Sequence, residues 1–503
     1  MLPQDLPLTL DRQDARSLAV QLADELRAAA GCGTVRMGDR LPSTRALATT
    51  LGVSRTVTSA AYDVLQAEGW IGGRRGAGTY VIAAPSVSAP PHPGPRPVPA
   101  QEQECGIDLR SGTPWSAGLR RAAWRRAWRS AADAEVLTRP VDAGVPEFRA
   151  AVVDHLLRHR GLALVPDAVL ATGGTTAALA ELAAVLLRSG DVVAVEEPGY
   201  PRAVGALRAA GLRVRPATVD SEGLVITALP DQARAVYCTP AHQYPLGATL
   251  SASRRLALVA WARERAAWVL EDDYDGELRH HGVPLPLLAT VGPDVVVYLG
   301  TASKILTPAL GVGWMAAPDE VVAAVCAYRT DTGVRPSPAG QRVLTALAVS
   351  GDLSRHLRRV RRELLARRDL LVGALRAAGL PVRGDQAGAH LVVDLPDADA
   401  ERDVVRRAAH EELLLDGLAR CHNGPPGCYG VTLGYAAPSS RSVLAAVLPR
   451  LTALLGRTAG SPGVGADDLP TAVGRSGPLV QSGELQRPIR ERPVEHVGPR
   501  VSE

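Results

Sequence analysis

Apolar positions recur at helical spacing through residues 12–82, and this segment ends in a Gly-rich stretch of β-prone residues. Ser43 and Ser54 each precede such a run, as helix-capping residues do, and Gly52 stands between the runs, where a tight turn is needed. The second run is expected to bury a stripe formed by Val57, Ala61, Val64 and Leu65. Residues 1–82 are therefore predicted to fold as an α+β winged helix-turn-helix domain.

The stretch from Ile71 to Val81 predicts the wing, a β-hairpin whose glycines let the backbone approach a partner closely. Residues 1–82 contain nine arginines and eight acidic residues, so their net charge is close to zero. Contact with DNA therefore depends on where the arginines stand. The first residues of the second helix usually reach base edges, and helix N-termini favour phosphate. The residues expected to contact double-stranded DNA are Arg45, Ser54, Arg55, Thr56, Arg74, Arg75 and Gly78. The pattern alone also fits a small helical module with solvated arginines.

The composition changes abruptly after residue 82. Seven prolines and almost no large apolar residue occupy the segment up to about residue 104, so no core can form there. Proline-rich segments favour extended polyproline II, at about 3.1 Å per residue. Residues 83–106 are therefore predicted to be a semi-rigid linker between two separable domains.

Short β-branched runs alternate with helical stretches rich in Ala, Leu and Arg from residue 107 to about residue 457. This alternation predicts an α/β domain with a mainly parallel sheet. Residues 458–503 turn to Gly, Pro, Ser and balanced charge without periodicity, and we expect them to be disordered. The chain is thus predicted to be multidomain, as its 503 residues also suggest.

Composition narrows the class of protein only modestly. The 46% hydrophobic and 21% charged residues are typical of a globular protein. No uncharged apolar run approaches the roughly 20 residues that span a bilayer, and the start lacks a basic signal-peptide region, so we expect a cytoplasmic protein without membrane contact. The six cysteines are scattered, which favours reduced thiols, and no metal site is expected. A net charge of +4 is too small to indicate a partner.

Lys304 is the only lysine in the chain. Arg can replace Lys as a surface charge, so a lysine that remains is a candidate for chemistry that Arg cannot perform. A covalent bond to an aldehyde requires a primary amine that can lose its proton. Lys304 directly follows an apolar strand-like run, with Thr301 and Ser303 just upstream. Without context, a residual surface lysine would be the simpler interpretation.

Further motifs provide that context, because ligands of open α/β sheets bind at the carboxyl ends of the strands. Asp272, Asp273 and Tyr274 end one apolar run; a carboxylate there can keep a pyridine nitrogen protonated, and a phenol can donate to a ring oxygen. Gly174 and Thr175 begin a helix, whose free N–H groups favour phosphate. Tyr200 follows another run, where its ring can stack on a cofactor. Taken singly, each residue also fits a structural role.

Both parts of the chain resemble known families. The elements PSTRALA, GVSRT, EGW and GAGTYV resemble the GntR-type winged helix-turn-helix. The order of the Gly-Thr helix start, Tyr200, TPAHQYPLG, EDDY and SK resembles the fold-type I aminotransferases, and most specifically the MocR/GabR regulators. The resemblance implies an aminotransferase-like domain over residues 107–457, with a smaller C-terminal α/β subdomain and bound pyridoxal 5'-phosphate. It also implies that Asp272, Tyr274 and Lys304 contact this cofactor.

Three positions depart from the pattern of that family. Gly311 stands where an arginine usually contacts the cofactor phosphate, seven residues after the lysine. Thr432 stands where an arginine usually clamps a substrate carboxylate. Arg139 and Pro140 replace a tyrosine that commonly reaches the cofactor of a neighbouring subunit. The first change predicts weaker cofactor binding, and the second argues against efficient transamination.

The leading hypothesis is a homodimeric, cofactor-dependent transcriptional regulator without catalytic residues, in which a small effector alters how two heads bind an operator. The effector would be an amine, another amino compound or pyridoxal phosphate itself. One alternative is a functional aminotransferase with a DNA-binding appendage. Another is a DNA-binding protein whose large domain is only a dimerisation scaffold without a cofactor.

Overall fold

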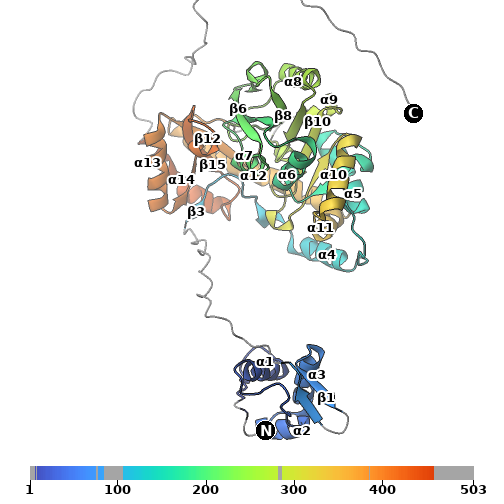
Figure 1. Cartoon of the computed structure of the whole chain (residues 1–503). Coiled ribbons are helices and arrows are strands. Elements are labelled where there is room, and N and C mark those ends of the chain that lie inside the picture. The colour runs from blue at the N-terminus through green and yellow to red at the C-terminus, as the bar shows by residue number, and fades with distance from the viewer. Residues whose placement is uncertain are drawn as a thin grey trace, which may run out of the picture. The chain divides into compact units, whose positions relative to one another are not determined.

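The computed structural model describes residues 6, 8–74, 78–83, 106–280, 286–384 and 386–457. The chain divides into two compact units, residues 1–103 and residues 104–503, which Figure 1 shows. Nearly all of the predicted linker (83–106) and all of the predicted disordered tail (458–503) lie outside the described residues. No helix of the described segments is long and apolar enough to cross a membrane.

The N-terminal unit contains the two predicted helices and the hairpin in the predicted order, and a further helix precedes them. Its elements are α1 (Leu18–Gly31), α2 (Thr44–Leu51), α3 (Arg55–Ala67), β1 (Ile71–Arg74) and β2 (Gly78–Val81). Both predicted caps are confirmed: Ser43 Oγ accepts a backbone N–H of α2 at 3.1 Å, and Ser54 Oγ accepts one of α3 at 3.4 Å. Gly52, at φ +63°, makes the turn between these helices in the left-handed region that favours glycine. Strands β1 and β2 pair antiparallel, as the wing prediction required.

The buried stripe of α3 differs in part from the prediction. Ala61 and Leu65 are buried as predicted, whereas Val64 is 39% exposed. Thr58 and Tyr62 take the remaining inward positions, because each hydroxyl donates to a backbone carbonyl in residues 42–44, both at 2.8 Å. A residue with an internal acceptor can be buried without losing hydrogen bonds, and hydrophobic periodicity does not detect this.

The second unit is built on an eight-stranded, mainly parallel sheet, as predicted. Its strand order is β4-β11-β10-β9-β8-β5-β6-β7. The strands are β4 (Val169–Thr172), β5 (Val192–Glu197), β6 (Arg213–Asp220), β7 (Gly223–Leu224), β8 (Ala233–Cys238), β9 (Trp268–Asp272), β10 (Val296–Thr301) and β11 (Gly313–Ala316). Only β11 and the short β7 run antiparallel to their neighbours.

Helices cover both faces of this sheet (Figure 1). On one face α6 (Thr175–Leu186), α7 (Pro201–Ala209) and α10 (Asp319–Thr332) pack on strand residues such as Val193 and Leu299. The alternate strand residues, including Ala194 and Tyr298, belong to the core of the other face. That core contains α4 (Arg121–Ala132), α5 (Pro146–Arg160), α8 (Ala252–Arg265), α9 (Leu288–Val291), α11 (Pro338–Val349) and α12 (Asp352–Ala377). Burial on both faces explains the continuous apolar runs in the sequence.

A smaller α/β subdomain follows α12, as the resemblance implied. Strands β12 (His390–Leu395), β14 (Asp416–Gly417) and β15 (Tyr429–Gly434) form an antiparallel sheet in the order β12-β15-β14. Its helices are α13 (Ala398–His410) and α14 (Arg441–Gly456). Strand β13 (Leu413–Leu414) pairs in parallel with β3 (Ile107–Asp108), which begins the second unit. The first residues of the unit are therefore attached to its last subdomain.

Candidate functional site

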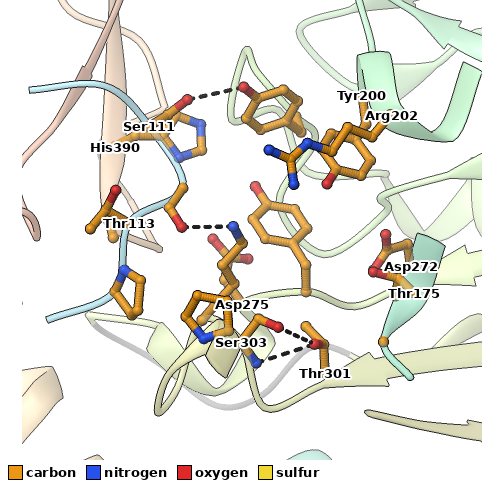
Figure 2. Close-up of a pocket in the computed structure, with 18 of the residues that line it drawn as sticks. Ser111, Thr113, Thr175, Tyr200, Arg202, Asp272, Asp275, Thr301, Ser303 and His390 are labelled. Atoms are coloured by element: carbon orange, nitrogen blue, oxygen red, sulfur yellow. Dashed lines mark hydrogen bonds between the residues drawn. The ribbon is translucent and has the colours of Figure 1, made fainter. Parts of the chain in front are cut away.

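A cavity of about 480 Å³ opens where the parallel strands end. Residues that follow β4, β5, β8, β9 and β10 all line it, together with residues from the segment after β3 and from the smaller subdomain (Figure 2). The cavity brings together all eight residues predicted to bind the cofactor: Gly174, Thr175, Tyr200, Asp272, Tyr274, Thr301, Ser303 and Lys304. The expectation that the carboxyl edge of the sheet forms the site agrees with this geometry.

Lys304 is the third residue of the loop that follows β10, and its side chain lines the cavity. Its Nζ donates to the carbonyl oxygen of Gly112 at 2.7 Å. Burial lowers the pKa of Lys304, although Asp272 and Asp275 act in the opposite direction. A lowered pKa increases the fraction of unprotonated amine, which is the nucleophilic form.

Asp272 ends β9 with one carboxylate oxygen paired and the other free. Oδ2 accepts the hydroxyl of Tyr237 at 2.6 Å, whereas Oδ1 is buried without a hydrogen-bond partner in the described structure. Burial raises the pKa of Asp272 to about 7. Its neighbour Asp273 instead binds Arg160 at 2.6 Å, so only Asp272 faces the cavity. An unpartnered buried acceptor is costly unless a ligand supplies a donor.

Tyr274 belongs to a buried polar network beside the lysine. The Nδ1 of His242 lies 2.8 Å from a carboxylate oxygen of Asp275 and 3.1 Å from the Tyr274 hydroxyl. The Nε2 lies 3.3 Å from the carbonyl of Gly384. Burial opposes protonation of His242, but the charge of Asp275 outweighs it and raises the His242 pKa. His390 adds a third ligand-type atom within 4.8 Å, yet both His242 nitrogens already face acceptors, which favours a hydrogen-bonded network over a metal site.

The start of α6 and the loop after β10 form a small polar cradle. No side chain caps α6, and Gly174 holds φ +109° at its N-cap, so the first N–H groups of the helix remain available. A Cβ on Gly174 would lie 3.9 Å from the hydroxyl of Thr301, and that hydroxyl lies 3.1 Å from the hydroxyl of Ser303. Figure 2 shows Thr175, Thr301 and Ser303 around this part of the cavity.

Tyr200 lies across the cavity, directly before α7. Its ring stands edge-on to that of Tyr244, with centroids 5.8 Å apart. Burial raises the pKa of Tyr200, so the phenol stays protonated at neutral pH. Because Tyr200 lines the cavity, its ring can contact a flat ligand there.

Several cavity residues were not predicted from the sequence. Arg202 lies two residues after Tyr200 and forms no ion pair with any described residue. Arg420 lines the cavity and pairs with Asp416, which stands opposite Thr432 in the β14–β15 register. The position of Arg202 after a strand could have identified it. No local pattern marks Arg420, because it comes from the distant smaller subdomain.

The three departures from the family pattern have distinct locations. Gly311 is exposed in the left-handed region, at φ +56°, and a Cβ added to it would meet no atom within 4 Å. Thr432 is fully buried in β15 and does not line the cavity. Arg139 and Pro140 are exposed and border a separate hollow of about 270 Å³. None of these residues lines the cavity or contributes a cation to it.

The N-terminal unit exposes much of its predicted DNA face. Arg45, Ser54, Arg55 and Thr56 are exposed at α2 and at the start of α3. Gly78 is exposed, and a Cβ there would lie 2.8 Å from Nε of Arg40, so the position favours glycine; its contact with DNA stays a prediction. Arg74 ends β1, and Arg75 lies outside the described residues.

Comparison with known proteins agrees with both units. The model of bacterial regulatory proteins of the gntR family matches residues 18–81, and that of aminotransferase class I and II matches residues 107–447. The pyridoxine biosynthesis transcriptional regulator PdxR of Corynebacterium glutamicum is 34% identical over 448 residues, covering 86% of this chain and 94% of that protein. The probable rhizopine catabolism regulatory protein MocR of Rhizobium meliloti is 31% identical, covering 85% and 92%. An archaeal alanine:glyoxylate aminotransferase superposes with a TM-score of 0.65 at 22% identity, over 70% and 91%.

A GntR-type head followed by an aminotransferase-type domain defines a class of two-part transcriptional regulators. The chain belongs to the MocR/GabR-type family of this class, and its function is transcriptional regulation. The head implies DNA binding, and the aminotransferase class I and II fold implies a pyridoxal phosphate site in the second unit.

Proposed function

We propose that this regulator binds pyridoxal phosphate covalently through Lys304 and uses occupancy of that site as its signal. The observation that carries the proposal is the free Oδ1 of Asp272, which lies in the same cavity as an amine of lowered pKa. When bound, the cofactor supplies an aldehyde for an amine and an electron-withdrawing pyridine ring. The donor set of the cavity fits both groups.

The roles of the remaining residues follow from their chemistry. Asp272 would accept the N–H of the pyridine ring, which removes the cost of an unpaired buried oxygen. Tyr274, oriented by His242, would donate to the ring hydroxyl oxygen. The uncapped start of α6 at Gly174 and Thr175, with the hydroxyls of Thr301 and Ser303, would bind phosphate. Tyr200 would stack on the ring.

The cofactor itself is the best supported effector. Gly311 provides no arginine for the phosphate, and losing such a charge-assisted bond weakens binding by about ten- to hundredfold. A cofactor held less tightly exchanges with the free pool and can report its concentration. The relative from Corynebacterium, which covers 86% of this chain, is named for regulation of pyridoxine biosynthesis. We therefore propose genes of vitamin B6 synthesis as the regulated class.

Transaminase turnover would be low or absent. Thr432 is buried away from the cavity, so the usual arginine clamp for a substrate carboxylate is missing. Arg202 and Arg420 do line the cavity, and they favour an acidic group on any second ligand. An effector carrying both an amine and an acid group is accordingly the second candidate for the signal.

DNA binding is assigned to the start of α3 and to the hairpin. The exposed Arg55 and Thr56 begin a helix capped by Ser54, as base-reading residues of a recognition helix do. Arg45, Arg74 and Arg75 would contact phosphates on either side. A homodimer would present two heads to a two-fold operator.

The test combines two measurements on the full chain. Borohydride reduction after incubation with pyridoxal phosphate should add the cofactor mass to the tryptic fragment that contains Lys304. Affinity for DNA selected from a random pool should then change as pyridoxal phosphate is titrated, at concentrations that match occupancy. DNA affinity that stays constant while the adduct forms would exclude the cofactor as the signal.

The aminotransferase alternative makes a different prediction. A panel of amino donors with a keto acid acceptor should give no sustained product if the chain only senses its ligand. Multiple turnovers per protein molecule with any donor would favour an enzyme with a DNA-binding appendage. A cofactor-free scaffold would give neither product nor adduct.

A further inference from the structure

Residues 110–115 form a strap along one side of the cavity, where Figure 2 shows Ser111 and Thr113. The strap is the first part of the second unit to reach the site, because it directly follows β3 and the linker segment. Gly112 and Thr113 are exposed, and both also line the cavity. Its inner side faces Lys304.

Both ends of the strap are attached to the body of the second unit. On the linker side, the backbone N–H of Leu109 donates to Leu414 at 3.0 Å, and Gly434 donates to the carbonyl of Leu109 at 2.6 Å. On the far side, Arg359 donates to the carbonyl of Gly118 at 3.0 Å. Trp115 packs within 5.6 Å of the buried Arg367 guanidinium. The strap therefore runs from contacts with Leu414 and Gly434 of the smaller subdomain to contacts with α12.

Two hydrogen bonds join the middle of the strap to the edge of the large sheet. The Lys304 amine donates to the carbonyl of Gly112 at 2.7 Å, and the hydroxyls of Ser111 and Tyr244 lie 3.0 Å apart. Gly112 adopts φ +102°, and a Cβ there would stand 3.1 Å from the amine nitrogen. Glycine thus permits the backbone to approach the amine closely.

Covalent use of Lys304 removes the first of these bonds. When the unprotonated amine joins the aldehyde carbon, a carbon–nitrogen double bond forms and water leaves with the aldehyde oxygen and both amine hydrogens. The one hydrogen that the nitrogen can then gain by protonation lies in the plane of the new double bond. The Gly112 carbonyl therefore loses the freely rotating donor that the amine provided.

We propose that the strap is the element that reports occupancy of Lys304 to the linker, being held by the free amine and released when the amine is bonded. This inference rests on the proposed covalent binding at Lys304 but concerns a different property, the route of the signal. A hydrogen bond to a charged group shifts an equilibrium by about ten- to hundredfold, enough to change which strap conformation predominates. The strap directly follows β3 and Leu109, so its release acts on the attachment of β3 to β13, beyond which the chain leads to the DNA-binding unit.

A nitroxide label on the exposed strap residue, introduced as Thr113→Cys in the full chain, measures this release. The exposed Cys32 is replaced by serine, and the protein without the added cysteine provides the labelling background. Addition of pyridoxal phosphate should shorten the rotational correlation time of the label by about threefold or more. Adduct mass is measured on the same samples.

Two substitutions of Lys304 separate the hydrogen bond from the covalent bond. Lys304→Arg keeps a charged donor for Gly112 but cannot bond the aldehyde, so the label should stay immobile with and without cofactor. Lys304→Ala removes the donor, so the label should be mobile in both conditions. DNA affinity should follow the label: the Ala variant should match the cofactor-loaded wild type, and the Arg variant the cofactor-free wild type.

The outcomes distinguish the two proposals. If the mobility of the label in the wild type stays unchanged although the adduct is complete, the strap proposal is wrong, and covalent binding at Lys304 still stands. A mobile strap in Lys304→Ala, without any adduct in wild type, would support the contact while refuting the proposed function. Equal DNA affinity of the two variants would show that release of the strap does not alter DNA binding. The proposal that the strap transmits the signal to the DNA-binding unit would then be refuted. If the Ala variant does not fold, the wild-type comparison alone still decides.

Discussion

Replacing Asp272 by Asn should stabilise the cofactor-free protein while weakening cofactor binding. Burial raises the pKa of Asp272 from 3.8 to about 7, so at alkaline pH the folded protein holds a carboxylate that would be better solvated in the unfolded chain. Each pKa unit corresponds to about 1.4 kcal/mol, which gives a penalty of about 4 kcal/mol at pH 8. Asn leaves an amide without a full set of partners, which costs about 1–2 kcal/mol. The expected net gain in unfolding free energy is about 2–3 kcal/mol.

The stability difference between Asp272→Asn and the wild type should depend on pH. Between pH 3.8 and about 7 the unfolded chain releases the proton of Asp272 while the folded protein keeps it. The stability of the wild type therefore falls as pH rises through this window and levels off above it. The advantage of Asp272→Asn should be largest at pH 8 and close to zero at pH 5.

Thermal or urea unfolding of the cofactor-free full chain at both pH values measures the effect. Asp231→Asn, at a carboxylate with 89% exposure, is the matched control and should change stability by less than about 0.5 kcal/mol. The same Asp272 variant should bind pyridoxal phosphate at least tenfold more weakly, because the ring nitrogen loses its anionic partner. A variant no more stable than wild type at pH 8 would refute the description of Asp272 as a buried carboxylate with one unpartnered oxygen.

Three further predictions concern other parts of the chain. Arg55→Ala should weaken DNA binding about tenfold and reduce the salt slope by about one if Arg55 contacts phosphate, whereas Arg27→Ala on α1 should leave both unchanged. Gly311→Arg should tighten cofactor binding, since a phosphate contact contributes about 1.5–3 kcal/mol, whereas the left-handed backbone cost of about 1–2 kcal/mol is present with and without cofactor and lowers the stability of the fold instead; an unchanged dissociation constant in an absorbance titration would contradict this. Arg329→Met should destabilise the second unit by about 3–5 kcal/mol, because it leaves the Glu181 carboxylate, now 2.7 Å away, without its buried partner. A loss below 1 kcal/mol in unfolding measurements would argue against that ion pair.

Local sequence patterns were sufficient for much of the architecture. The caps at Ser43 and Ser54 and the glycine turn at position 52 act within a few residues, so they could be predicted without the fold. The alternation of β-branched runs and helices likewise predicted the mainly parallel sheet. Because parallel strands end at a common edge, the same pattern placed Lys304, Asp272 and Tyr200 in one site.

Orientation within an element was predictable only in part. The local pattern did not distinguish Asp272 from Asp273, which follow each other at the end of one strand, and only the resemblance to the family selected Asp272. Successive residues of a strand point to opposite faces, and the structure directs Asp272 into the cavity and Asp273 toward Arg160. In α3, Val64 was wrongly expected to be buried, because the polar Thr58 and Tyr62 find backbone acceptors that periodicity does not reveal.

The sequence by itself determined the two units, the edge of the sheet at which the site forms and the one amine available there. Tertiary structure alone decided what surrounds that amine: Gly112, 192 positions away, and Arg420 from the smaller subdomain. Local preferences depend on neighbours within a few residues, whereas these contacts depend on how β3 pairs with β13 and how the smaller subdomain packs. The free energy that establishes such long-range contacts comes from burying the whole core, which no short segment of the sequence encodes.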